Sequence, residues 1–149
     1  MASDLPSPTE PGPAGTFRLR TERSAVGLER LGLWVDEIAA RLTLGVAVEY
    51  ALRLCLEEAV ANVVMHGVPV PGTDANWIAL AVEPVADRLR LTVTDRCAAF
   101  DPRSAPEPDI AGSDDRVGGL GIHLMRRYAR DVFYAREGPE NHLTMTIPA

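Results

Sequence analysis

The chain of 149 residues has no lysine, only two cysteines and few aromatic residues, which make up 5% of the total. Without lysine there can be no Gly-Lys-Ser/Thr phosphate loop, so a Walker-type nucleotide site is excluded. Cys55 and Cys97 have neither the close spacing of a metal centre nor the density of a secreted disulfide scaffold. We therefore expect a reducing compartment, with the cytoplasm as the default location.

Long apolar runs and a positive net charge are also missing. No stretch reaches the roughly 18 apolar residues that a membrane span needs, and the N-terminus lacks the apolar core of a signal peptide. The formal net charge is −6, and the arginines are mostly scattered, so no basic stripe is available for a phosphate backbone. The sequence therefore predicts neither membrane contact nor direct nucleic-acid binding.

What is present fits one soluble domain, with 46% hydrophobic and 24% charged residues. Residues 1–15 are the exception, because they are rich in proline, glycine and serine. Such a segment cannot bury enough apolar surface to offset the entropy of ordering, so we predict a disordered tail. The folded domain should span residues 16–149.

Hydrophobic periodicity predicts a series of strands and helices between residues 16 and 147. In chain order, they are a strand from about 17, helices at 24–38 and 46–66, strands at 76–83 and 88–94, a helix after 118–121, and strands at 132–136 and 142–147. Tight turns between consecutive strands imply mainly antiparallel pairing. We therefore predict an α+β two-layer sandwich, in which about three helices cover one face of a mixed, mainly antiparallel sheet.

Two connections carry further expectations. Residues 101–117 contain Pro, Asp, Ser and Gly and scarcely any apolar side chain, and a loop this long in a compact domain is usually functional or disordered. Gly138 and Asn141 are predicted to form the turn before the last strand.

The helix at 46–66 carries a polar stripe inside an apolar run. Glu58 and Asn62 are four residues apart, so they point the same way, and His66 extends the stripe by another turn. An amide oxygen can bind Mg²⁺, and an acid one turn away can act as a general base. The alternative is the polar edge of an amphipathic helix, which is the commoner origin of an isolated Glu-x-x-x-Asn. For His66, a residue near the C-terminal dipole is a better reading than a metal ligand.

Two further segments have side chains or amides suited to a nucleotide. Asp95 follows an alternating strand, where a carboxylate can accept a hydrogen bond from an exocyclic amine, although a turn-forming aspartate is the simpler reading. Gly118-Gly119-Leu120-Gly121 leads into a helix, whose free N-terminal amides can bind an anion. Glycines also let a phosphate approach the backbone closely. Arg116, just before them, is a candidate phosphate contact.

The three segments, in this order and spacing, resemble the Bergerat-fold (GHKL) ATPase superfamily. Within it, the chain looks like the small stand-alone anti-sigma factor serine/threonine kinases. "LEEAVANVVMHG" is similar to the N box of the family, "VTDRCAAFDP" to its Asp-x-Gly box, and "VGGLGIHLMRRYARDVFY" to its second glycine box with the following helix. The ending "ENHLTMTI" also matches the final strand of the family, and the resemblance covers residues 16 to 147.

The resemblance implies roles for particular residues. Glu58 would be the catalytic base, Asn62 the Mg²⁺ ligand and Asp95 the acceptor for the adenine amine, while residues 101–117 would form the lid over ATP. The nucleotide-binding set that it implies is Asn62, His66, Asp95, Phe100, Arg116, Gly118, Gly119, Leu120 and Gly121.

The resemblance also implies a function: an anti-sigma regulatory factor with Mg-ATP-dependent serine/threonine kinase activity. It would phosphorylate an anti-anti-sigma partner of the STAS type, sequester a sigma factor when that partner is unavailable, and form a homodimer. A sensor histidine kinase is not favoured, because 149 residues leave no room for a dimerisation helix pair with a phospho-accepting histidine.

One departure from the family leaves a second function open. Cys97 and Ala99 stand where the Asp-x-Gly box has glycines. If the backbone at Cys97 requires positive φ, its Cβ costs on the order of 1 kcal/mol, and its side chain could crowd the purine. The alternative is a nucleotide-independent partner-switching protein with a degenerate ATP site.

Overall fold

The computed structural model describes residues 15–104 and 117–149. The tail predicted over residues 1–15 lies outside them, apart from Gly15, and so does most of the predicted lid, including Arg116. The elements, in chain order, are β1 (Phe17–Glu22), α1 (Ala25–Leu42), α2 (Val46–His66), β2 (Trp77–Val85), β3 (Arg88–Asp95), the short 3-10 helix η2 (Pro102–Ser104), α3 (Val117–Tyr128), β4 (Arg130–Glu137) and β5 (Glu140–Pro148).

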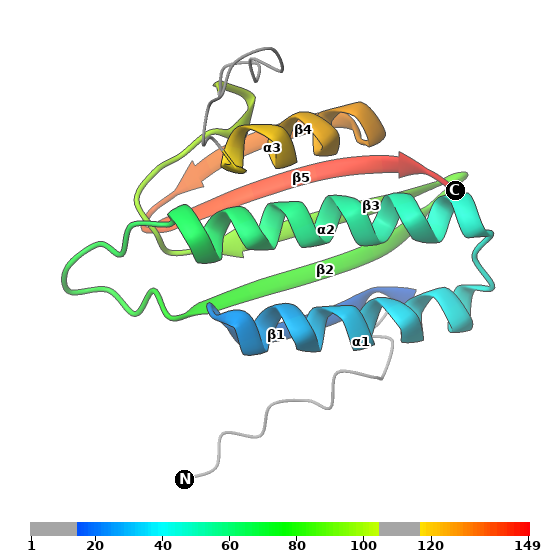
Figure 1. Ribbon diagram of the computed structural model, residues 1–149, viewed down its shortest axis with the longest axis horizontal. Helices are drawn as coiled ribbons and strands as arrows, with labels where there is room; N and C mark the ends of the chain where they lie inside the picture. The colour runs from blue at the N-terminus through cyan, green and yellow to red at the C-terminus, as the bar shows by residue number, and fades with distance from the viewer. Residues whose placement is uncertain (1–14, 105–116) are drawn as a thin grey trace, which may run out of the picture.

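The five strands form one sheet in the order β1-β2-β3-β5-β4, and each of these pairings is antiparallel. The three α-helices lie side by side on one face of this sheet, with α2 between α1 and α3 (Figure 1). The predicted α+β two-layer fold is confirmed, and the sheet of the described residues is antiparallel throughout rather than mixed.

The core lies between the sheet and α2, which explains why α2 is apolar on most of its sides. Strand residues that face the helices alternate with residues on the open face, as the burial pattern of β5 shows. Leu52 and Leu56 of α2 are fully buried, and so are Leu91 of β3 and Met145 of β5. Burial of each such side chain stabilises the fold by about 1.5–3 kcal/mol. The same burial fixes how α2 is rotated over the strands.

Local boundaries differ from the sequence prediction in three places. The β2–β3 turn is two residues long, and Ala86 adopts a positive φ of 54° there. The sequence does not predict this conformation, because alanine rarely adopts it. Asn141 lies within β5 and is buried, so the prediction that it forms a turn is wrong. Helix α3 begins at Val117, so Gly118 and Gly119 belong to its first turn rather than preceding it.

Within the residues that the structure describes, no helix combines the length and the apolar character needed to cross a membrane.

Candidate functional site

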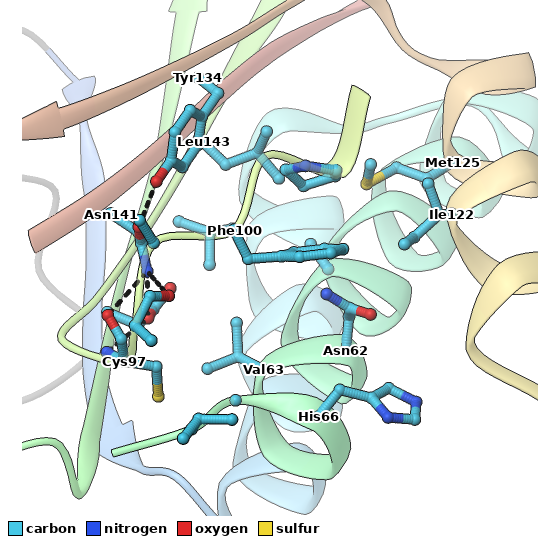
Figure 2. Close-up of a pocket in the computed structure, with 18 residues that line it drawn as sticks. Asn62, Val63, His66, Cys97, Phe100, Ile122, Met125, Tyr134, Asn141 and Leu143 are labelled. Carbon is cyan, nitrogen blue, oxygen red and sulfur yellow. Dashed lines mark hydrogen bonds between the residues drawn. The ribbon is translucent and has the colours of Figure 1, made fainter. Parts of the chain in front are cut away.

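A cavity of about 230 Å³ opens between α2, the middle of α3, the C-terminal end of β3 and the start of β5. Figure 2 shows two facing walls, with Asn62, Val63 and His66 of α2 on one side and Asn141 and Cys97 on the other. Apolar side chains of α3 and the sheet close the inner end, namely Val93, Ile122, Met125 and Leu143. A mostly apolar hollow with a few polar groups aimed into it is the usual form of a small-molecule site.

Asp95 is the buried acid of the strand wall, with 6% of its surface exposed. Its Oδ1 accepts hydrogen bonds from the backbone N–H of Cys97 at 2.9 Å and from Asn141 Nδ2 at 3.0 Å. Asp95 also shares a side-chain hydrogen bond with the Cys97 thiol. Because Asp95 lines the cavity, its carboxylate can accept a further hydrogen bond from a ligand.

Asn141 stands opposite Asp95 in the β3–β5 pairing and holds it in place. Its Nδ2 also donates to the carbonyls of Cys97 and Ala98, each at 3.1 Å. Its Oδ1 accepts from the Tyr134 hydroxyl and from Arg136 Nη1, the latter at 3.0 Å. The strand wall is therefore a hydrogen-bonded network rather than a set of independent side chains.

Cys97 is buried and lines the cavity, but its backbone is not strained. The described non-glycine residues with positive φ are Thr43, Ala86 and Asp131, so the condition under which Cys97 would cost about 1 kcal/mol is not met. Burial, followed by the charge of Asp95, raises the pKa of the Cys97 thiol, which keeps it protonated at neutral pH.

The Cys97 sulfur packs against the end of α2. A Cβ built on Gly67 would lie 2.7 Å from Cys97 Sγ and 2.4 Å from the Val63 carbonyl oxygen, so only glycine fits there. Residues 97–98 also pair with the loop after α2, through a bridge between Pro69 and Cys97 and a 2.7 Å hydrogen bond from the Ala98 N–H to the Val68 carbonyl. We call this pairing the clasp.

The α2 wall differs because its polar side chains are unpartnered. Asn62 is half-buried and lines the cavity, and its amide makes no hydrogen bond within the described part of the chain. His66, one turn further, is exposed at the rim. An unpaired amide oxygen suits a hard cation such as Mg²⁺. The described residues contain no group of three His, Cys, Asp or Glu side chains placed to bind a metal ion.

Glu58 does not line the cavity itself but meets α3 beside it. A Cβ built on Gly121 would lie 2.1 Å from Glu58 Oε2, so the carboxylate occupies the space that the missing side chain leaves. The acid of α2 and the glycine segment of α3 are therefore direct neighbours, although 63 positions separate them in the chain. The first backbone N–H groups of α3, from Val117 through Gly119, have no intrahelical acceptor and can face an anion.

Phe100 lies across the middle of the cavity, between the two walls (Figure 2). With 47% of its surface exposed, it is held less firmly than the buried residues around it. Of the predicted set, the structure therefore gathers Asn62, His66, Asp95 and Phe100 around one cavity. It places Glu58 and Gly121 together at its edge, and no side-chain position is described for Leu120.

Residues 22–147 match the model of the histidine kinase-like ATPase domain. The chain belongs to the histidine kinase-like ATPase family. It is similar to the serine/threonine-protein kinase BtrW of Bordetella bronchiseptica, at 36% identity over 115 residues, which are 76% of this chain and 80% of that protein. Among solved structures it is similar to the histidine kinase domain of the blue-light activated histidine kinase EL346 of Erythrobacter litoralis, with 15% identity and a TM-score of 0.49. The similarity covers 81% of this chain and 60% of that one.

In this ATPase-family chain, sequence reasoning missed three residues of the site: Tyr134, Arg136 and Asn141. The sequence predicts a turn at Gly138 and Asn141, which leaves Asn141 outside the predicted site. Its alternation with the buried Leu143 and Met145 was the available signal, because residues two apart on a strand share a face. No sequence signal pairs Tyr134 and Arg136 with it, since that contact depends on the register between β4 and β5.

Proposed function

We propose that this chain is an anti-sigma regulatory factor with Mg-ATP-dependent serine/threonine kinase activity. Its substrate would be a hydroxyl of a STAS-domain anti-anti-sigma partner, and it would sequester a sigma factor when that partner is unavailable. The family of ATPase domains and the relative that is named a serine/threonine kinase support this proposal. The expected homodimer stays a prediction.

The observation that carries the proposal is the meeting of Glu58 with Gly121 beside a cavity that holds Asn62 and Asp95. The carboxylate of Asp95 fits an exocyclic amine, as in adenine, and the apolar inner end fits the faces of a purine. The unpartnered Asn62 amide fits one coordination position of Mg²⁺, which usually keeps waters and phosphate oxygens as its other ligands. The residues present therefore fit Mg-ATP.

Bound Mg-ATP would supply the transferable phosphoryl group and the neutralisation of its charge. The protein would supply position and a base. The substrate hydroxyl oxygen forms a bond to the γ-phosphorus while the bond from that phosphorus to the bridging oxygen breaks, which releases ADP. Glu58 takes the hydroxyl proton, and the first amides of α3 stabilise negative charge on the phosphates.

A second candidate is a partner-switching module that works without nucleotide. The observation behind it is that the Cys97 side chain lines the cavity at a position where the family has glycine. Backbone strain and crowding of the purine were the two reasons to expect weak ATP binding. The backbone of Cys97 is unstrained, so crowding by its side chain is the reason that remains.

Two measurements on the purified chain decide between these candidates. Calorimetry with Mg-ATP should give saturable binding, and incubation with Mg-ATP and a STAS-domain partner should transfer labelled phosphate to serine or threonine. Saturable binding without transfer to any hydroxyl would contradict the kinase proposal. The absence of heat at millimolar nucleotide would favour the nucleotide-independent module.

A further inference from the structure

Gly67, the residue that ends α2, is a glycine for reasons of space rather than of backbone conformation. Its φ of −62° and ψ of 131° are angles that any residue adopts. A Cβ at this position would lie 2.7 Å from Cys97 Sγ, which is closer than real Cβ contacts come. Figure 2 shows the Cys97 sulfur directed away from Phe100, which lies in the middle of the cavity. The missing side chain of Gly67 therefore leaves a notch in which the Cys97 thiol is accommodated.

The backbone of Cys97 is fixed, so only its side chain can respond to a change at Gly67. The Cys97 N–H donates to Asp95 Oδ1 at 2.9 Å. Its carbonyl oxygen accepts from Arg136 Nη1 at 2.7 Å and from Asn141 Nδ2 at 3.1 Å. With both backbone polar groups held, the thiol can move only by rotation about the Cα–Cβ bond, among three staggered positions.

A filled notch would turn the thiol toward the ligand. Cys97 is only 3% exposed, so close-packed neighbours surround it, and the open space that it borders is the cavity. A sulfur rotated away from residue 67 enters this space, where the proposed site holds the purine. The side chain at residue 67 thus decides whether Cys97 crowds a bound nucleotide.

We propose that Gly67 is a positioning residue for nucleotide binding, which receives the Cys97 thiol and so keeps the purine end of the cavity open. The inference rests on the proposed nucleotide site. At this contact one of the two facing residues must lack a side chain, and in this chain it is residue 67. The pairing explains how a cysteine can stand where the family has glycine without closing the site.

The test is a double-mutant cycle read by calorimetry with Mg-ATP, on the unaltered chain, Gly67→Ala, Cys97→Ala and the double variant. Gly67→Ala should weaken ATP binding at least about tenfold where the thiol is present, and at most about threefold where residue 97 is alanine. In the double variant the two Cβ atoms are 3.4 Å apart, an ordinary contact. The 2.4 Å contact of the new Cβ with the Val63 carbonyl oxygen is the same in both backgrounds, so only the thiol can produce the difference.

A second comparison does not depend on the folding of Gly67→Ala. Cys97→Val carries two γ-carbons that point in different directions from Cβ, so at most one of them can face Gly67. This variant should bind Mg-ATP at least about fivefold more weakly than Cys97→Ala. Gly45→Ala is the matched control, because Gly45 is the N-cap at the other end of α2 and a Cβ there meets nothing within 4 Å. Its ATP affinity should stay within about twofold of the unaltered chain.

Three outcomes would overturn the inference. Equal losses from Gly67→Ala in the two backgrounds would mean that the Val63 contact, and not the thiol, causes them, while the proposed function stands. Binding of ATP more than about tenfold tighter by Cys97→Ala than by the unaltered chain would mean that the thiol already crowds the purine. If neither the unaltered chain nor Cys97→Ala binds ATP, the proposed function fails, and this inference fails with it.

Discussion

The two walls of the cavity differ in how their polar side chains are hydrogen-bonded. On the strand wall, Asp95 and Asn141 are buried, and each is held by several hydrogen bonds. On the α2 wall, Asn62 has no hydrogen-bond partner among the described residues. Groups that recognise a fixed shape gain from being preorganised. Groups that bind a cation or an incoming hydroxyl must instead keep an oxygen lone pair available for it. Substitutions on the two walls should therefore affect different properties.

The largest effect is expected from Glu58→Gln. Loss of the base should lower phosphotransfer to the partner by about 10²- to 10⁴-fold, while ATP affinity changes by less than a few-fold. Single-turnover transfer of labelled phosphate and calorimetry measure the two quantities separately. Glu57→Gln is the control, because this neighbour has a half-exposed side chain that lies 4.0 Å from Arg53 and does not line the cavity. A fully active Glu58→Gln chain would remove Glu58 from the mechanism.

The strand wall should show its role in stability. Asn141→Ala removes the amide that joins Asp95, Tyr134 and Arg136, and leaves buried polar groups unpaired, so the free energy of unfolding should fall by about 3 kcal/mol. Asn62→Ala loses no hydrogen bond, and the change should stay within about 0.5 kcal/mol. Urea denaturation of the two variants measures the difference. Equal losses would contradict the contrast between the walls.

The α2 wall should show its role in the metal dependence of binding. Asn62→Ala should weaken ATP binding in the presence of Mg²⁺ by about tenfold, the effect expected when one directly coordinating group is lost. Binding with EDTA present should be unchanged. Met65→Ala, on the same helix and exposed, is the control. If Asn62→Ala weakens binding equally with and without the metal, Asn62 is not its ligand.

A smaller effect is expected where α3 meets α2. Gly121→Ala places a Cβ 2.1 Å from Glu58 Oε2, so the acid must move, and phosphotransfer should fall by about threefold to tenfold. The free energy of unfolding should fall little or rise by up to about 1 kcal/mol, because alanine is the better helix former and the displaced atom ends a flexible side chain. Gly32→Ala is the control, since a Cβ there would meet only Arg53 Nη1, at 3.9 Å. Unchanged transfer in Gly121→Ala would mean that the position of Glu58 is not critical.

Most helices and strands could be predicted from the spacing of apolar residues in the sequence. The predictions that were wrong have physical reasons. Helix α2 was predictable because Gly67 ends a long apolar run, and the strands because their side chains alternate. Glu58 and Asn62 could be paired because helical spacing is local. Asn141 could not be assigned, since its partners come from β3 and β4 and depend on register. The strain expected at Cys97 required a φ angle, which sequence does not supply.

The clasp between residues 97–98 and the loop after α2 bears on how this cavity can change shape. Because the Ala98 N–H bonds to the Val68 carbonyl and Cys97 pairs with Pro69, the two walls are tied together at this end of the cavity and cannot separate there without breaking that pairing. A ligand must therefore be admitted without parting residues 97–98 from the loop after α2.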